Sequence, residues 1–214
     1  MIRRITVVLA DDHAMVREAL ARILRDSGMI DVVGHANDGS EVVKVVEQTM
    51  PQCVVLDYSM PNLDAPQVIE ILVRRQPQVK ILVLTVHENV HYALRALEAG
   101  AHGYMIKSAA ADELVNAIKA VHGGEIYISP RVSPDVVRLL CRPKRKRVGL
   151  ESLSQREFDF LRTLGSGNTL QECARQLNVS VSTASTYRAR IMGKLNLENT
   201  AELIRFALEH GMVD

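Results

Sequence analysis

The chain has 214 residues, of which 47% are hydrophobic and 24% charged, values that are ordinary for a globular protein and exclude a chain that stays disordered. No run reaches the ~18 apolar residues of a membrane span, so we expect a cytoplasmic protein that does not enter a membrane. The net charge is +1, but it is unevenly distributed. Residues 1–140 contain 14 Lys and Arg and 17 Asp and Glu, whereas residues 141–214 contain 12 Lys and Arg and 8 Asp and Glu. The basic back half is therefore suited to binding a polyanion.

Five short apolar runs in the front half are typical of β-strands that are buried on both faces of a parallel sheet. Their bounds are Ile5–Ala10, the weaker Asp31–Ala36, Cys53–Leu56, Lys80–Val86 and Gly103–Lys107. After each run, apolar residues recur at spacings of three and four, which is typical of amphipathic helices. Five βα units predict an α/β doubly wound, five-stranded parallel sheet in a domain that covers residues 1–128.

The carboxyl ends of these strands carry charged and hydroxyl side chains. They are Asp11 and Asp12 after the first strand, Asp57 at the end of the third, Thr85 at the end of the fourth and Lys107 at the end of the fifth. Functional groups gather at this edge of an open sheet. Three carboxylates in one crevice repel one another, so Lys107 and a hard divalent cation, for which Mg²⁺ is the best candidate, must offset their charge. Such a site suits transfer of a phosphoryl group to a carboxylate nucleophile.

Some of these residues also have an ordinary structural interpretation. An isolated Asp12 is equally consistent with a cap on the helix that starts at Ala14, and an isolated Lys107 with a solvated surface lysine. The four strand ends taken together favour a shared site, because chance is a poor account of acids, a hydroxyl and an ammonium at all of them.

Residues 5–128 resemble the receiver domain of two-component signalling, which has a flavodoxin-like fold. The resemblance is carried by the runs VVLADDHAMVREAL, VVLDYSMPNLD, ILVLTV and AGAHGYMIKSA. It implies that Asp57 accepts a phosphoryl group from a sensor histidine kinase. The implied Mg²⁺ ligands are Asp11, Asp12, Asp57 and the backbone carbonyl of Ser59. The residues implied to respond to the phosphoryl group are Thr85, Lys107 and the aromatic switch Tyr104.

Two positions depart from the receiver pattern, and one predicted role has an alternative. Ala65 stands where the family usually has Gly, so a positive φ there would strain the backbone. Val86 follows the switch threonine where the family often has a smaller residue, and a bulkier side chain would narrow access to Asp57. The alternative for Tyr104 is an aromatic residue at the edge of the sheet.

Residues 129–150 are expected to form a linker that contains a helical stretch, Pro134–Leu140. Cys141–Gly149 follows and reads CRPKRKRVG, in which five residues are Lys or Arg. Such a stretch either adds phosphate contacts beside a DNA-binding domain or is a solvated, self-repelling tether, and the sequence leaves both open.

The back half, residues 151–214, is predicted to be an all-α domain of four helices. Capping boxes mark three helix starts, at Ser154 with Glu157, at Thr169 with Glu172 and, in a looser form, at Asn199 with Glu202. Ser180 or Ser182 caps the remaining helix.

Two of these helices, Leu170–Leu177 and Val181–Leu195, are joined by a very short turn. This is the helix-turn-helix arrangement, in which the second helix lies in the major groove of DNA. That helix carries Arg188, Arg190 and Lys194 and no acid. In this position, three cations without an acid favour nucleic-acid contact over a merely solvated helix face.

Residues 153–213 resemble the LuxR-type DNA-binding domain of the NarL/FixJ subfamily, through the runs LSQRE, QECARQL, SVSTAS and IMGKL. The candidates for DNA contact are Ser182, Thr183, Ser185, Thr186, Arg188, Ala189, Arg190 and Lys194. Ser185 stands where the family often has a Lys that reaches the DNA. We therefore expect affinity to depend mainly on phosphate contacts, with some specificity from DNA shape.

The two resemblances predict a non-enzymatic, DNA-binding transcriptional response regulator that is switched by Mg²⁺-dependent phosphorylation of Asp57. It is expected to be a homodimer when phosphorylated or bound to double-stranded DNA. The alternative is a protein-docking receiver or a phosphorylation-independent regulator with weakened DNA binding, which Ser185 favours slightly and the basic linker opposes. A phosphatase is disfavoured, because such enzymes need an acid/base Asp where this chain has Ser59.

Overall fold

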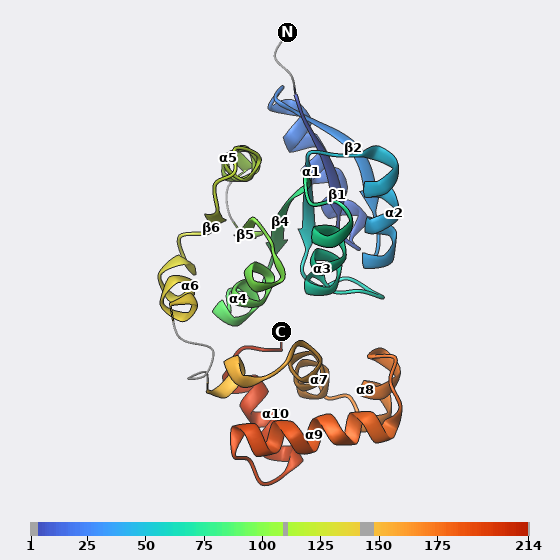
Figure 1. The fold of residues 1–214 in the computed structure, drawn as a ribbon, viewed down its shortest axis with the longest axis vertical. Helices are drawn as coiled ribbons and strands as arrows, with labels where there is room; N and C mark the ends of the chain where they lie inside the picture. Colours follow the sequence, from blue (N-terminus) through green and yellow to red (C-terminus); the bar gives the residue numbers. More distant parts are fainter. Residues whose placement is uncertain (1–3, 109–110, 142–147, 214) are drawn as a thin grey trace. The chain divides into compact units, whose positions relative to one another are not determined.

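A computed structural model describes residues 4–108, 111–141 and 148–213 of the chain, which divides into two compact units, Met1–Val136 and Val137–Asp214 (Figure 1). Most of the predicted basic stretch, residues 142–147, lies outside the described residues. The domain boundaries expected at residues 128 and 150 stay a prediction. Within the described ranges, no helix is long and apolar enough to cross a membrane.

The first unit is built on a single sheet with the strand order β2-β1-β3-β4-β5-β6. The strands are β1 (Ile5–Ala10), β2 (Ile30–Ala36), β3 (Cys53–Asp57), β4 (Lys80–Thr85), β5 (Gly103–Ile106) and β6 (Tyr127–Ile128). All neighbouring pairs are parallel. The predicted number of five strands is therefore wrong by one. The additional strand, β6, has only two residues, too few to form the apolar run from which the others are predicted.

Helices cover both faces of this sheet (Figure 1). They are α1 (Ala14–Asp26), α2 (Gly39–Thr49), α3 (Ala65–Arg75), α4 (Val90–Ala99) and α5 (Ala111–His122), and α6 (Ser133–Leu140) follows β6. On one face, Leu24 of α1 and Ile118 of α5 pack in one apolar cluster with strand residues such as Leu9. On the other face α3 lies between α2 and α4 and contacts both. This arrangement puts the carboxyl ends of the strands, and the loops that leave them, at one edge.

The loop that follows β3 is packed against the start of α2. The N–H of Gly39 donates to the carbonyl of Pro61 over 3.2 Å, and a Cβ at Gly39 would collide with the carbonyl of Leu63. Asp38 caps the same helix by accepting hydrogen bonds from two N–H groups of its first turn. Because only glycine fits between the helix and the loop, the loop has a fixed place beside the end of β3.

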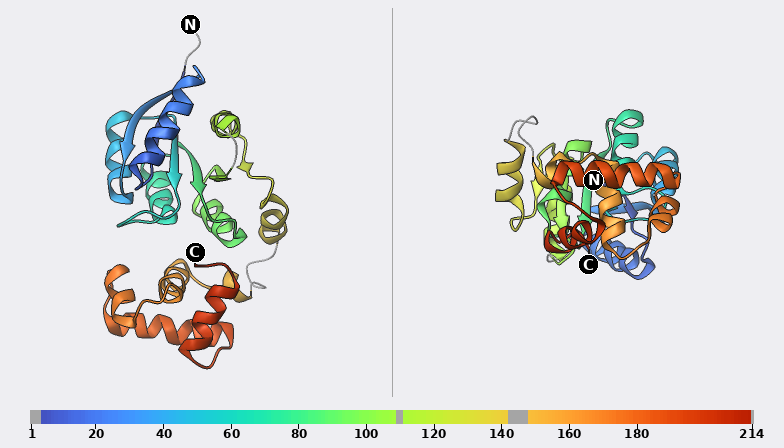
Figure 2. Two further views of the ribbon diagram at one scale, coloured as in Figure 1. Left: turned by 180° about the vertical axis from the view of Figure 1, so that it is seen from behind. Right: turned by 90° about the horizontal axis from the view of Figure 1, so that it is seen from below.

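The second unit contains a 3₁₀ turn and the helices that follow it (Figure 2). Its elements are η2 (Gly149–Ser152), α7 (Gln155–Gly165), α8 (Leu170–Gln176), α9 (Val181–Leu195) and α10 (Thr200–Glu209). The turn between α8 and α9 is short, and α7 packs on α8, α9 and α10. Apolar side chains from these helices form the core, including Phe158 of α7, Ile191 of α9 and Leu203 of α10, all of which have no exposed surface.

Side-chain caps define where these helices begin. Reciprocal capping boxes are present at Ser154 and at Thr169, and Asn199 accepts a hydrogen bond from the N–H of Glu202. Of the two serines considered for α9, Ser180 is the cap. Each cap satisfies an N–H group that the helix itself cannot pair.

Replacing Gly39 by alanine is predicted to destabilise the first unit by about 2 kcal/mol, because the added methyl group collides with a backbone carbonyl that cannot rotate away. The measurement is urea-induced unfolding of the full chain. Gly193→Ala is the matched comparison: its Cβ meets nothing within 4 Å in α9, so this helix should gain about 0.5 kcal/mol. If Gly39→Ala were as stable as wild type, the loop after β3 would have moved to accommodate the methyl group, and the prediction would be wrong.

Candidate functional site

Lys107 bridges two buried carboxylates at the carboxyl edge of the sheet. Its Nζ donates to Asp11 Oδ2 over 2.6 Å and to Asp57 Oδ2 over 2.9 Å. Asp11 follows β1, Asp57 ends β3 and Lys107 follows β5, so the topology brings three strand ends together. Asp11 is 2% exposed and Asp57 7%. The structure thus holds an ammonium between two negative charges that have little contact with water.

Burial governs the protonation of this cluster. It raises the pKa of the Asp57 carboxyl, a rise that Lys107 opposes and the Asp11 carboxylate supports. Burial alone would lower the pKa of Lys107, but its hydrogen bonds to the two carboxylates outweigh burial and raise that pKa. Lys107 therefore stays charged at neutral pH. One ammonium faces two buried carboxylates and the nearby Asp12, so a second positive charge would relieve repulsion.

The same carboxylates form a set of donors that fits a hard divalent cation. Asp11, Asp12, His13 and Asp57 each offer one ligand atom, and these atoms lie within 4.8 Å of one another. Mg²⁺ prefers a few carboxylate oxygens and completes its shell with water, which the partly exposed Asp12 side chain allows. Ser59, whose carbonyl is the remaining predicted ligand, lies in the loop directly after β3.

His13 belongs to this cluster although the sequence analysis did not single it out. Its Nδ1 lies 2.7 Å from Asp12 Oδ1, and its backbone N–H donates to Asp11 Oδ1 over 2.8 Å. The available signal was its position immediately after the two acids.

Thr85 and Tyr104 are buried and both bond to the backbone of His87. The His87 N–H donates to Thr85 Oγ1 over 3.2 Å, and the Tyr104 hydroxyl donates to the His87 carbonyl over 2.8 Å. Burial raises the pKa of the Tyr104 phenol, which keeps it protonated as a donor. The alternative of a sheet-edge aromatic fails on position, since β6 pairs with the outer side of β5.

The structure describes both positions that depart from the receiver pattern, Ala65 and Val86. Ala65 is the first residue of α3 and is not among the described non-glycine residues with positive φ, so the expected strain does not arise there. Val86 is 59% exposed. Its side chain therefore lies largely at the surface, and narrower access to Asp57 stays a prediction.

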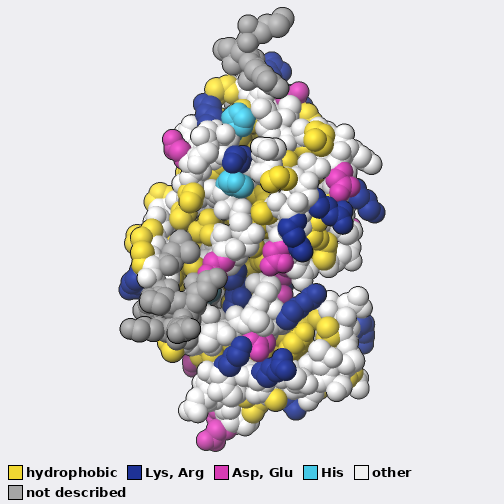
Figure 3. Space-filling view, viewed as in Figure 1, with side chains coloured by type: hydrophobic (Ala, Val, Ile, Leu, Met, Phe, Trp, Pro, Cys, Tyr) yellow, Lys and Arg dark blue, Asp and Glu magenta, His cyan; other side chains and the backbone are white. Residues whose placement is uncertain are grey.

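Most predicted DNA-contacting residues lie on the accessible surface of α9. Ser182, Thr186, Ala189 and Arg190 are exposed, and Thr183, Ser185 and Arg188 are half-buried. Figure 3 shows Lys and Arg side chains standing out from a mostly neutral surface on the visible face of this unit. The helix thus presents hydroxyls, a methyl group and two guanidinium groups.

Lys194, the remaining predicted residue, is engaged within its own unit. Its Nζ donates to Glu157 Oε2 over 2.6 Å and to the Ser152 carbonyl over 3.1 Å. Glu157 is 4% exposed, and burial would raise its pKa, but the hydrogen bond from Lys194 and those from Ser154 outweigh burial and lower it. The ion pair therefore ties the end of α9 to the start of α7.

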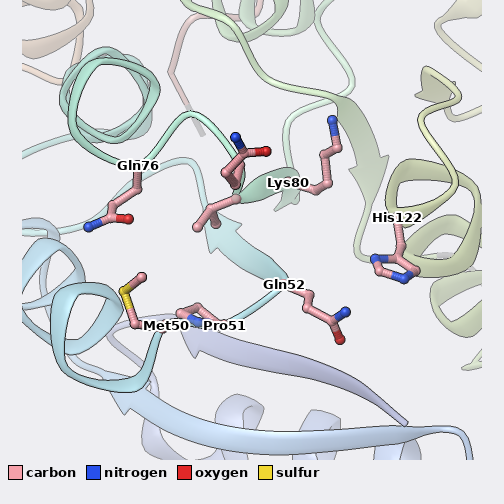
Figure 4. Close-up of a pocket in the computed structure, with 8 residues that line it drawn as sticks. Met50, Pro51, Gln52, Gln76, Lys80 and His122 are labelled. Atoms are coloured by element: carbon pink, nitrogen blue, oxygen red, sulfur yellow. The ribbon is translucent and has the colours of Figure 1, made fainter. Parts of the chain in front are cut away.

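A separate pocket lies at the opposite edge of the sheet (Figure 4). It has a volume of about 350 Å³, and its lining includes Pro51 just before β3, Lys80 at the start of β4 and His122 at the end of α5. Because these residues lie at the amino ends of the strands, the pocket is no part of the Lys107 cluster.

Both units match known protein families. Residues 7–119 match the response regulator receiver domain, and residues 151–207 match the bacterial regulatory proteins of the luxR family. The response regulator GacA of Pseudomonas aeruginosa is 35% identical over 98% of both chains. UvrY of Escherichia coli K12, also a response regulator, is 35% identical over 97% of this chain and 95% of its own.

Solved structures give the same relationship. The RcsB response regulator of Salmonella typhimurium matches 98% of this chain and 99% of its own with a TM-score of 0.78 and 25% identity. RcsB in complex with DNA matches 96% of this chain and 98% of its own with a TM-score of 0.62 and 26% identity.

Lys194→Met is predicted to destabilise the second unit by about 2 kcal/mol, because it leaves the Glu157 carboxylate buried without its cation. Adding Glu157→Gln should restore most of the loss, since an amide keeps the capping box without the charge. Arg190→Met, on an exposed residue of the same helix, is the control and should change stability by no more than about 0.5 kcal/mol.

The pair also predicts a pH dependence, measured by unfolding wild type and the double variant across pH. The folded-state pKa of Glu157 is lowered from its ordinary 4.5, so the pair's stabilisation is present above pH 4.5 and lost as pH falls through the folded value. A difference that stayed constant down to pH 2 would contradict this role.

Proposed function

The chain belongs to the response regulators that join a receiver domain to a LuxR-type DNA-binding domain, and from this premise we propose that it is a transcription regulator switched by phosphorylation of Asp57. The observation that carries the proposal is the Lys107 bridge between Asp11 and Asp57. The bridge holds the Asp57 carboxylate, the proposed nucleophile, beside a cation, and the neighbouring carboxylates form a donor set that suits a divalent metal ion, which supports the proposal.

In the proposed reaction, a sensor histidine kinase supplies the phosphoryl group from a phosphohistidine. A carboxylate oxygen of Asp57 forms a bond to phosphorus while the phosphorus–nitrogen bond breaks, and the histidine leaves with the bonding pair and takes up a proton. Mg²⁺, held by Asp11, Asp12, Asp57 and the Ser59 carbonyl, would neutralise charge on the phosphoryl oxygens. The Lys107 ammonium, which already donates to the Asp57 carboxylate over 2.9 Å, would stabilise the same oxygens.

The phosphorylated aspartate then acts on neighbouring groups. It adds negative charge and three strong acceptor oxygens in a largely dry pocket. Lys107 and the Thr85 hydroxyl bind these oxygens, and Tyr104 responds to the displacement of Thr85. A two-state arrangement of the loops is thereby biased toward the active form.

DNA binding is assigned to α9 and to the basic surface around it. Arg188 and Arg190 contact phosphates, while Ser182, Thr183, Ser185, Thr186 and Ala189 face the base edges. Lys194 contributes chiefly by holding α9 to α7 through Glu157. That RcsB has been solved bound to DNA supports this assignment. A homodimer on paired half-sites and phosphate contacts from the basic stretch at residues 142–147 complete the proposal.

The test measures binding to double-stranded DNA before and after treatment with a small-molecule phosphodonor and Mg²⁺, on wild type and Asp57→Ala. Wild type is expected to gain about tenfold in affinity, a typical allosteric coupling, and Asp57→Ala to gain nothing. Arg190→Ala should weaken binding to all sequences and lower the salt dependence, as removal of a phosphate contact does.

An equal response in wild type and Asp57→Ala would overturn the proposed switch. Phosphorylation of Asp57 with no DNA binding at any salt concentration would favour a protein-docking receiver instead.

A further inference from the structure

The pocket at the amino edge of the sheet has no part in the proposed function, although it is large enough for a ligand (Figure 4). Its volume of about 350 Å³ lies at the lower end of the range for small-molecule sites. The lining comes from both faces of the sheet, because His122 ends α5 on one face, and Met50 and Gln76 follow α2 and α3 on the other. Pro51 and Val79 are both buried, so they offer apolar contact to the body of a small ligand.

Backbone hydrogen bonds hold the walls of this pocket in place. The Lys80 N–H donates to the Gln52 carbonyl over 3.0 Å. The Val79 N–H likewise donates to the Gln76 carbonyl over 3.0 Å. The Gln52 side chain is fixed as well, because its Oε1 accepts a hydrogen bond from the Thr6 N–H over 3.1 Å. With these groups already fixed, the pocket is largely preformed, which lowers the entropic cost of binding a ligand.

The polar groups that line the pocket are basic or neutral. They are one ammonium, one imidazole and three amides, which belong to Lys80, His122, Gln52, Gln76 and Gln78. Among the described residues, no carboxylate lines the pocket and none forms a salt bridge with Lys80. The charge of Lys80 acts on its surroundings, since burial and, to a smaller extent, this charge lower the pKa of the His102 imidazole. A half-buried ammonium in such a lining favours a bound anion.

The surroundings favour a singly charged anion over a phosphate. Of the described helices, α2, α3 and α5 end at this edge rather than begin there, and the carbonyl ends of helices repel concentrated negative charge. A single lysine is enough to pair with one carboxylate. We propose that the pocket binds a small organic carboxylate, with its charged group on Lys80 and its apolar body against Pro51 and Val79. The proposal is independent of the proposed function, because it involves none of the residues around Asp57.

The test titrates the full chain with benzoate as the probe and follows the backbone amide signals by nuclear magnetic resonance. We expect saturable shifts at Gln52, Gln76 and His122, with a Kd of about 1 mM, as is typical of a ligand with so few atoms. Benzamide has the same ring without the charge and should bind about fivefold more weakly, because it loses the charge-assisted contact. Inorganic phosphate should bind more weakly than benzoate.

A substitution of the lysine tests the role of its charge. Lys80→Met keeps the apolar stem and should weaken benzoate binding about tenfold, the loss expected for one hydrogen bond between charged groups. Lys44→Met removes an exposed lysine of α2 outside the pocket and is the matched control, which should bind benzoate as wild type does. If Lys80→Met folds poorly, His122→Ala serves instead, since His122 is exposed, and should weaken binding about threefold.

Shifts that do not saturate, or that lie outside the pocket, would overturn the proposal. Equal affinity in wild type and Lys80→Met would do the same, and so would tighter binding of phosphate than of benzoate. The result is separate from that of the phosphorylation switch, because Asp57→Ala should bind benzoate as wild type does.

Discussion

The ammonium of Lys107 between the carboxylates of Asp11 and Asp57 is the constraint on which the first unit depends. Two acids that are almost entirely buried cannot stay ionised so close together without a cation. The ends of three strands must meet to bring these groups together, so the charged cluster depends on the parallel topology of the sheet. The charge that remains uncompensated makes the pocket receptive to a metal ion and, with it, to a phosphoryl group.

A lysine paired with a buried carboxylate is also present in the second unit. A buried carboxylate, Glu157, is paired with one lysine and completes a helix cap at the same time. There the pair has no reaction to perform and serves to orient α9 on its neighbours. The two clusters differ in balance: one lysine offsets one acid at Glu157, whereas Lys107 faces several. The Glu157–Lys194 pair has equal numbers of positive and negative charges and stabilises the packing of α9 on α7. The Lys107 cluster keeps an excess of negative charge, which favours binding of a cation.

Much of the fold and the pocket could be predicted from the sequence because both depend on patterns of neighbouring residues in the chain. Apolar runs mark β1 to β5, and the charged residues follow those runs directly. The features that could not be predicted from the sequence were either very short elements or contacts between residues far apart in the chain. The two residues of β6 carry no periodicity, and nothing near His87 in the sequence indicates its contact with Ser59, which lies 28 positions away. The bond of Lys194 to Glu157 joins residues 37 positions apart, so the sequence does not indicate this ion pair, and DNA contact by Lys194 stays a prediction.

The most direct test of this account is thermal unfolding of the first unit within the full chain, for wild type and Asp57→Asn at pH 7.5, with and without Mg²⁺. Wild type should gain about 1.4 kcal/mol when Mg²⁺ exceeds its dissociation constant tenfold. Asp57→Asn should be more stable than wild type without metal, because it removes a buried charge whose pKa is raised, and should gain little from Mg²⁺. A wild type indifferent to Mg²⁺, or an Asp57→Asn variant that is less stable without it, would contradict the account.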